Sequence, residues 1–317
     1  MDLKAVGFIG LGIMGLPMAK NLSQKLPSNT KLYVFDVVED AMKNLEAAAA
    51  NDRVVSCKSA AEVTNHVDVL IVIVPEGKHA RAVFLDEKTG VITANIGNKI
   101  LIDCSTIDTE TSQHIAAELH SKDPSATFFD APISGGSLGA ENGSLTFMVG
   151  CAESSPHWAM LEGLFKIMGK SIFACGSQSM GLVAKLSNNY CSGLIAIATS
   201  EAMNVAMKSG MDPRVLAKIF STSTAQSTIC DKWCPVPGVV PTAPSSNEYR
   251  GGFKVQLMKK DFSLAVDAAK AVGATLYLGE PGLNVYQAAS EDPNCRDRDS
   301  RVVFRYLGGN EDWSKSD

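Results

Sequence analysis

Short apolar runs alternate with helical patterns over the first half of the chain. Continuous apolar runs such as residues 69–74 are typical of parallel strands covered on both faces. We expect strands at residues 6–9, 31–36, 54–56, 69–74, 99–104, 127–130, 145–149 and 171–174. Helical patterns lie between them, at residues 16–22, 41–50, 79–84, 109–120 and 154–168, with Thr109 as an N-cap. This alternation predicts an α/β domain with a doubly wound, largely parallel sheet.

The second half of the chain, after Gly176, lacks strand signals. Residues 178–210 have helical composition, with apolar positions nearly all round, so we expect a helix buried between domains and against another subunit. Further helices are expected at 213–220 and 253–272, with loops at 235–244 and 292–299. We therefore predict two domains, an α/β domain over 1–177 and an all-α domain over 178–317.

Composition and charge exclude several classes of function. With 317 residues, 45% hydrophobic and 20% charged, the chain resembles an ordinary globular protein of about two domains. The net charge of −5, with no basic stripe, argues against nucleic-acid and anionic-membrane partners. No run of 18 apolar residues predicts a membrane span, and no signal or transit peptide is evident at the N-terminus. Eight scattered cysteines are typical of reduced thiols in an intracellular protein, and neither they nor the histidines have metal-site spacing.

A glycine motif follows the first predicted strand directly. Gly10, Gly12 and Gly15 form G-x-G-x-x-G between strand and helix, which is the context that a dinucleotide fingerprint requires. The first glycine allows the tight turn, the second lets a pyrophosphate approach the backbone, and the third lets helix and strand pack closely. Pro17 suits the first helical turn. Glycine spacings of this kind also occur by chance, so the motif needs a second observation.

Asp36 supplies that observation, because it ends the second strand 21 residues after Gly15. A carboxylate at this place accepts hydrogen bonds from the adenosine ribose and repels a 2′-phosphate. No Arg or Lys follows in residues 37–40, which favours NAD over NADP. The alternative is a solvated Asp at a strand end. Together with the glycine motif, Asp36 predicts that residues 1–177 form a dinucleotide-binding Rossmann-type domain. In doubly wound sheets ligands lie beyond the carboxyl ends of the strands, where Pro75 and Thr106 are expected.

Two further clusters have residues suited to binding and catalysis. A Ser134-Gly135-Gly136 turn after a strand exposes a hydroxyl and bare N–H groups that suit a carboxylate, although a plain turn would have the same sequence. Lys185 and Asn189 are four residues apart and share one face of the long helix, with Gly181 one turn before them leaving space for a ligand. Burial lowers the pKa of an amine, as a general base requires. Lys185 could instead extend to solvent or pair with a carboxylate.

A third cluster, residues 257–265, reads by itself as an amphipathic helix with a solvated Lys-Lys-Asp face. The chain has no H-E-x-x-H metal motif and no G-x-S-x-G nucleophile elbow, which disfavours hydrolase chemistry.

Together these motifs resemble the β-hydroxyacid dehydrogenase family, and most closely its 3-hydroxyisobutyrate branch. The resemblance spans residues 6 to about 286. It rests on the segments 7–15, 130–136, 145–150, Gly181 to Asn189, Lys260-Asp261, and, for the branch, 235–239 with 249–253. His79, where the family often has Asn, and Val74, where it often has Leu, depart from the pattern.

The resemblance implies roles for individual residues. Lys185 would be the catalytic acid/base, and Asn189 would position it and the substrate hydroxyl. Ser134, Gly135 and Gly136 would hold the substrate carboxylate. The implied cofactor contacts are Gly10, Leu11, Gly12, Ile13, Met14, Gly15, Asp36, Val74, Pro75, Thr106 and Lys260. The implied reaction is NAD-dependent oxidation of 3-hydroxyisobutyrate to methylmalonate semialdehyde in valine catabolism, by a homodimer or homotetramer, in the mitochondrial matrix of a eukaryote or the cytoplasm of a bacterium.

Other functions remain open at this point. A tartronate semialdehyde or succinic semialdehyde/glyoxylate reductase of the same family often favours NADPH, against which Asp36 argues. A 6-phosphogluconate dehydrogenase would need a much longer C-terminal domain. A non-catalytic nucleotide-binding relative would be expected to lack the Lys185 and Asn189 pair.

Overall fold

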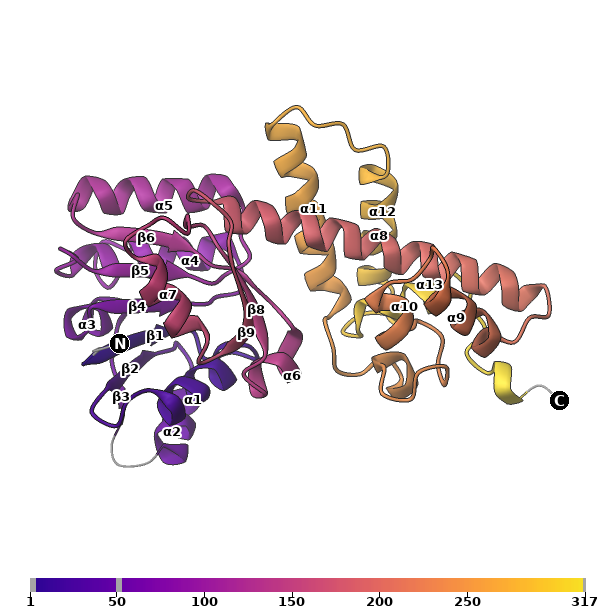
Figure 1. Ribbon diagram of the computed structural model, residues 1–317, viewed down its shortest axis with the longest axis horizontal. Helices are drawn as coiled ribbons and strands as arrows, with labels where there is room; N and C mark the ends of the chain where they lie inside the picture. Colours follow the sequence, from indigo (N-terminus) through magenta and orange to yellow (C-terminus); the bar gives the residue numbers. More distant parts are fainter. Residues whose placement is uncertain (1–3, 50–52, 316–317) are drawn as a thin grey trace. The chain divides into compact units, whose positions relative to one another are not determined.

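Six parallel strands form the main sheet of the first half of the chain, in the order β3-β2-β1-β4-β5-β6 (Figure 1). The computed structural model describes residues 4–49 and 53–315 and divides into two units, Met1–Lys185 and Leu186–Asp317. The strands of this sheet are β1 (Ala5–Ile9), β2 (Lys31–Phe35), β3 (Val54–Ser56), β4 (Val69–Val72), β5 (Ile100–Asp103) and β6 (Thr127–Asp130). The order reverses between β1 and β4, so the carboxyl ends of these two strands form the ligand-binding crevice that doubly wound sheets share.

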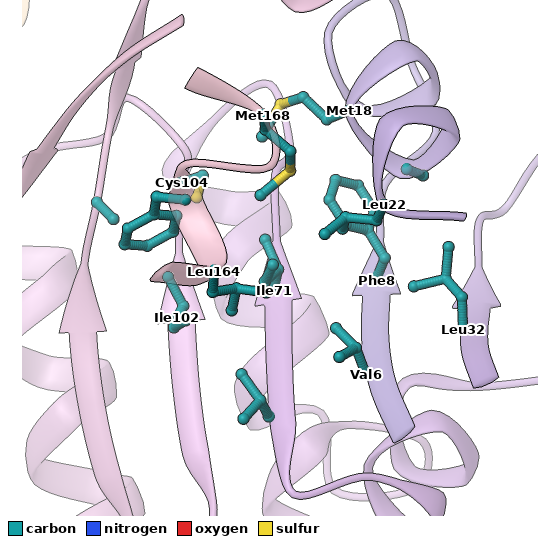
Figure 2. Packing of buried hydrophobic residues seen from close by; sticks show 14 of the residues in the cluster. Val6, Phe8, Met18, Leu22, Leu32, Ile71, Ile102, Cys104, Leu164 and Met168 are labelled. Atoms are coloured by element: carbon teal, nitrogen blue, oxygen red, sulfur yellow. The ribbon is translucent and has the colours of Figure 1, made fainter. Parts of the chain in front are cut away.

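Helices cover both faces of the main sheet because neighbouring residues along each strand point to opposite faces. Val69 and Ile71 join the core beneath α1 and α2, whereas Leu70 and Val72 join the core beneath α3, α4 and α5. Figure 2 shows Phe8 packed in the first of these cores. The helices are α1 (Gly15–Lys25), α2 (Glu39–Ala48), α3 (Ala60–His66), α4 (Gly77–Leu85), α5 (Thr109–Lys122), α6 (Gly136–Glu141) and α7 (Trp158–Phe165).

A second, three-stranded sheet follows the main one, and this corrects the expectation of one continuous sheet. Its order is β7-β8-β9, with β7 (Ile133–Ser134) antiparallel to β8 (Leu145–Val149) and β8 parallel to β9 (Gly169–Ala174). The chain turns after β6 and pairs Ser134 with Thr146, so residues 145–149 and 169–174 never join the main sheet.

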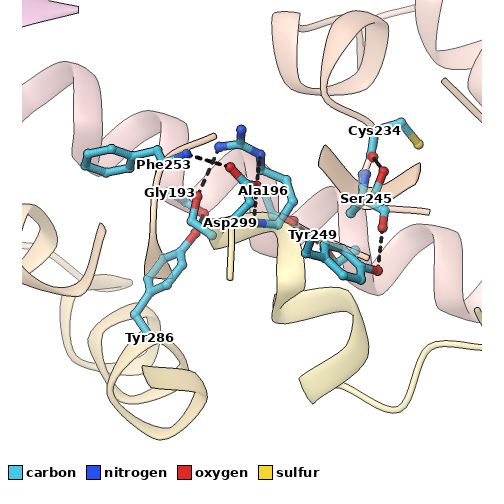
Figure 3. A network of polar contacts seen from close by, with 12 residues as sticks. Gly193, Ala196, Cys234, Ser245, Tyr249, Phe253, Tyr286 and Asp299 are labelled. Atoms are coloured by element: carbon cyan, nitrogen blue, oxygen red, sulfur yellow. Dashed lines mark hydrogen bonds and ion pairs between the residues drawn. The ribbon is translucent and has the colours of Figure 1, made fainter. Parts of the chain in front are cut away.

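The second unit consists of helices packed around aromatic residues. The long helix α8 (Met180–Lys208) contains the boundary between the units, and α9 (Pro213–Thr222), α10 (Thr228–Lys232), α11 (Val255–Ala271), α12 (Gly279–Glu291) and α13 (Val303–Tyr306) follow. Short 3-10 turns span Val91–Thr93, Pro244–Asn247, Ser300–Val302 and Trp313–Lys315. The ring of Phe262 in α11 lies at a tilt of 46° to that of Tyr286 in α12, with 5.6 Å between the ring centroids. The Tyr286 hydroxyl donates to Gly193 O of α8 (Figure 3).

Several local expectations need correction. Asp108, not Thr109, caps α5, because its carboxylate accepts the Thr111 N–H at 2.6 Å. The helix expected over 154–168 spans only Trp158–Phe165, and α3 and α12 were not predicted. Residue 50, the expected end of a helix, lies outside the described residues. On α8, Val183 and Val205 are 40% and 67% exposed within one chain, so burial of this helix against another subunit stays a prediction.

Candidate functional site

The three glycines of the first loop each have a different surrounding, and each surrounding matches one predicted role. Gly10 has φ +96°, and a Cβ there would lie 2.0 Å from Ile73 O, so only glycine can make this turn. A Cβ on Gly15 would lie 1.8 Å from Gly10 O, which shows how closely α1 meets β1. A Cβ on Gly12 would meet no atom within 4 Å. The loop is thus closed by its outer glycines and open at the middle one, where a pyrophosphate would approach.

Asp36 anchors this loop as well as ending the second strand. Its two carboxylate oxygens accept the N–H groups of Leu11, at 2.5 Å, and Val38, at 2.8 Å. The carboxylate therefore holds the glycine loop against the β2 end, with lone pairs left for ribose hydroxyls. Ile13, Val37 and Val38 around it are exposed apolar side chains. The loop and its carboxylate fit a dinucleotide that carries a free 2′-hydroxyl.

The loops after β4 and β5 are joined by a serine. Ser105 Oγ accepts the N–H of Val74 at 2.9 Å, and Ser105 N–H donates to Asp103 Oδ1. Pro75 and Thr106 follow directly in the two loops, at the carboxyl edge where the sequence places cofactor contacts. Burial, with a smaller contribution from the Asp130 carboxylate, raises the pKa of Asp103 to about 7.

The Ser-Gly-Gly segment forms the turn between β7 and α6. Ser134 is half-buried at the end of β7, and Gly135 and Gly136 have φ +133° and +64°. A Cβ on Gly136 would meet no atom within 4 Å, so the backbone here is open to a small ligand, as at Gly12. The two positive φ values explain why glycine occupies both positions.

Lys185 lies in the second turn of α8 and is only 7% exposed. The expectation that Gly181 leaves room for a ligand is wrong, because a Cβ there would lie 2.1 Å from Met148 O and 2.8 Å from Asp130 Oδ2. Gly181 instead lets the helix start pack directly on β8. Asp130, which the sequence showed only as the first residue of a motif, is 1% exposed and accepts amide N–H groups at this helix start.

In the second unit, a polar network surrounds Asn189. The Asn189 side chain donates to Asp261 Oδ2 at 2.6 Å and accepts from Asn188. Asp261 is 2% exposed, and its other oxygen lies 3.1 Å from Lys260 Nζ. The sequence indicated Lys260 but not Asp261, although the two stand side by side in it. Only the fold shows that Asp261 faces α8, whereas the sequence alone favoured a solvated Lys-Lys-Asp face.

Neither a cluster of metal ligands nor a membrane-spanning helix occurs among the described residues. Over residues 4–49 and 53–315, no group of three or more His, Cys, Asp or Glu side chains is placed to hold a metal ion. Cys230 contacts the hydroxyls of Ser227 and Thr199. Among the helices of the described residues, none is both long and apolar enough to cross a membrane.

Comparison with known proteins adds the family. Residues 5–176 match the model of the NAD binding domain of 6-phosphogluconate dehydrogenase, and residues 179–307 match that of the NAD-binding domain of NADP-dependent 3-hydroxyisobutyrate dehydrogenase. The probable mitochondrial 3-hydroxyisobutyrate dehydrogenase of Dictyostelium discoideum is 40% identical over 307 residues, covering 97% of this chain and 92% of that protein.

Two other relatives share nearly the whole length. The NAD-dependent L-serine dehydrogenase of Pseudomonas aeruginosa is 36% identical over 95% of this chain and 97% of its own. The structure of the Mycobacterium tuberculosis 3-hydroxyisobutyrate dehydrogenase with L-serine superimposes with a TM-score of 0.86 at 32% identity, covering 96% of this chain and 99% of that one. The chain therefore belongs to the β-hydroxyacid dehydrogenase family, among the 3-hydroxyisobutyrate dehydrogenases, and is an NAD-dependent oxidoreductase.

Proposed function

We propose that this protein oxidises 3-hydroxyisobutyrate to methylmalonate semialdehyde with NAD⁺, as a step of valine catabolism. The observation that carries the proposal is Lys185, a lysine 7% exposed near the start of α8, in the same unit as the open glycine loop. A lysine held on a helix and shielded from solvent offers an amine at a fixed place, as proton transfer to or from a bound substrate requires. The names of relatives up to 40% identical support the substrate.

The chain's own residues would act as follows. The open turn at Ser134, Gly135 and Gly136 binds the substrate carboxylate through its hydroxyl and backbone N–H groups. Lys185, as a neutral amine, accepts the proton of the C3 hydroxyl and returns it in the reverse direction. Asn189, four residues further along α8, hydrogen-bonds the substrate hydroxyl, with its amide oriented by Asp261.

The cofactor would be held by the residues that the family resemblance indicates. The glycine loop (Gly10 to Gly15) and Asp36 would bind pyrophosphate and adenosine ribose, and Val74, Pro75, Thr106 and Lys260 would contact the rest. The chemistry supplied by bound NAD⁺ would be acceptance of a hydride from C3, which would leave that carbon as an aldehyde once the hydroxyl proton has gone to Lys185. Alignment of these groups supplies much of the rate advantage of such a reaction.

Two variants test the assignment of Lys185. We expect Lys185→Ala to lower turnover by about 10³-fold, because proton transfer loses its acceptor. Lys208→Ala, which removes an exposed lysine at the other end of α8, serves as the matched control and should keep normal turnover. Turnover of Lys185→Ala within about tenfold of wild type would contradict the acid/base role.

L-Serine is a second candidate substrate, favoured by the similarity to an L-serine dehydrogenase and to a structure that holds L-serine. L-Serine is also a small 3-hydroxy acid, with an ammonium group where 3-hydroxyisobutyrate has a methyl group. Both enantiomers of 3-hydroxyisobutyrate, together with L-serine and a panel of other small 3-hydroxy acids, would be assayed with NAD⁺ and NADP⁺. A kcat/KM for L-serine above that for 3-hydroxyisobutyrate would reassign the substrate.

We also propose the context in which the enzyme works. We propose that the boundary between the two domains lies near residue 178, and the start of the second family match at residue 179 supports this. An assembly of two or four copies is proposed, supported by the exposed Val183 and Val205 of α8, and sedimentation equilibrium tests it. In a eukaryote the compartment is the mitochondrial matrix, as the names of the relatives suggest, and in a bacterium the cytoplasm.

A further inference from the structure

Asp130 joins three parts of the first unit through one buried residue. It ends β6, four residues before Ser134, and its carboxylate oxygens accept the N–H groups of Ser179 at 2.6 Å and Leu182 at 2.8 Å. These amides belong to the start of α8, where N–H groups have no partner within the helix. The backbone carbonyl of Asp130 accepts the N–H of Gly150, at the end of β8, at 2.8 Å.

Two glycines pack so closely against this carboxylate that neither position has room for a side chain. A Cβ on Gly150 would lie 1.9 Å from Asp130 Oδ1, and a Cβ on Gly181 would lie 2.8 Å from Oδ2. The same Cβ on Gly181 would also lie 2.1 Å from the carbonyl oxygen of Met148. At Gly181 the start of α8 therefore packs directly against the backbone of β8 and against the Asp130 carboxylate.

The neighbouring carboxylate shows that this arrangement is specific to Asp130. Asp103 is paired with Asp130 in register on β5 and is equally buried. Its Oδ1 accepts the N–H of Ser105 in its own loop, and its Oδ2 has no hydrogen-bond partner. Of the two carboxylates, Asp130 is the one that bonds to the amides of α8.

We propose that Asp130 is a positioning residue, which sets the place of Lys185 relative to the Ser134-Gly135-Gly136 turn. Lys185 follows Leu182 by three residues in the same rigid helix, and the turn begins four residues after Asp130. The positions of the proton acceptor, Lys185, and of the proposed carboxylate site thus both depend on the Asp130 side chain. This inference rests on the proposed function of Lys185. A displacement of about 1 Å between reacting groups can cost about 10²-fold in rate.

Asp130→Asn tests the proposal, because asparagine keeps the size but offers one acceptor oxygen to amides that now use two. We expect kcat to fall by about 30- to 300-fold while KM for NAD⁺ changes less than about threefold. The control is Asp212→Asn, which alters a carboxylate that accepts an N–H at the start of α9, a helix without predicted site residues. It should keep turnover within about twofold, since surface changes have small effects.

A double variant separates positioning from a general loss of structure. If Asp130 acts through Lys185, then Asp130→Asn in the Lys185→Ala background should lower the residual turnover less than about twofold. A further 30-fold fall there, which would mean that the two effects multiply, would overturn the proposal.

The activities of Lys185→Ala and Asp130→Asn together separate the positioning role of Asp130 from the acid/base role of Lys185. Normal turnover in Lys185→Ala overturns both, whereas an inactive Lys185→Ala with a normally active Asp130→Asn overturns the positioning role alone. If Asp130→Asn does not fold, Gly181→Ala displaces the same helix start, because its Cβ would lie 2.1 Å from Met148 O. It should lower kcat while NAD⁺ affinity is retained, and normal kcat in a folded Gly181→Ala would contradict the proposal.

Discussion

The glycine loop of the first unit and the polar networks of the second are built by opposite means. In the loop, the proposed binding of the cofactor depends on where the backbone passes, and the three glycines lie within six residues of one another. Around Asn189, the proposed role depends on a side chain 72 residues away, at Asp261. A second network in this unit joins Phe253 to Asp299, 46 residues apart. The residues that form a site from backbone atoms thus lie within a short segment of the sequence. Those that form a site from side chains are pairs that lie far apart in the sequence.

The largest expected effect tests the backbone-built site. Gly10→Ala forces a Cβ to within 2.0 Å of Ile73 O at a φ of +96°. We expect a loss of about 4 kcal/mol or more in the stability of the first unit, because neither backbone segment can move aside. Gly12→Ala is the matched control for stability, since its Cβ would meet no protein atom within 4 Å. Thermal unfolding and NAD⁺ titration measure the two variants.

Gly12→Ala should unfold at the wild-type temperature but bind NAD⁺ at least about tenfold more weakly, because the methyl group lies where the pyrophosphate approaches. Equal NAD⁺ affinity in Gly12→Ala and wild type would place the pyrophosphate elsewhere.

The next effect concerns the side-chain-built region, at Asp299 (Figure 3). This carboxylate is fully buried, accepts the N–H groups of Phe253 and Arg301, and forms an ion pair with the Arg301 guanidinium at 2.7 Å. Asp299→Ala leaves a buried arginine without its counter-charge, which typically costs about 3–5 kcal/mol. Asp297→Asn, in an exposed pair with Lys254, should leave the unfolding temperature unchanged. Chemical denaturation of both variants compares them, and similar losses would mean that burial is not what matters.

A smaller effect is expected at Asp36, a residue whose side chain fixes the position of backbone atoms. Its side chain holds the backbone loop by accepting the N–H groups of Leu11 and Val38. Asp36→Asn can accept only one of them well, so we expect NAD⁺ binding to weaken by about 1–3 kcal/mol. The preference for NAD⁺ over NADP⁺ should narrow as well, because a charge that repels the 2′-phosphate is lost. Steady-state kcat/KM with each cofactor measures both changes, and an unaltered cofactor ratio would remove Asp36 from cofactor selection.

The same contrast explains what the sequence could and could not predict. The strands of the main sheet were predicted because a continuous apolar run, such as residues 69–72, indicates a buried strand without knowledge of its partners. The second sheet was missed because β7 has two residues and pairs with a strand further along the chain. Asp36 could be predicted from its spacing to Gly15. Asp130 and Asp261 could not be assigned a role, because their partners at residues 179, 182 and 189 are brought near only by the fold.

The smallest effect tests whether the first unit is purely backbone-built. Asp103 is buried, and burial together with the Asp130 carboxylate raises its pKa to about 7, against about 3.9 in an unfolded chain. Between these values the folded protein binds more protons than the unfolded one, so stability falls as the pH rises through this window. Burial also raises the pKa of Asp130, which contributes in the same direction.

Asp103→Asn removes one of these two titrating carboxyl groups and should make the stability of the protein depend less on pH. Because asparagine cannot ionise, the stability of the variant relative to wild type should improve on going from about pH 5 to about pH 8, by on the order of 1 kcal/mol. Asp130 remains in the variant, so some slope of the same sign should persist. Unfolding temperatures of both proteins at the two pH values give the measurement. An equal slope in both would show that Asp103 is ionised throughout, and that its unbonded oxygen is tolerated as a buried charge.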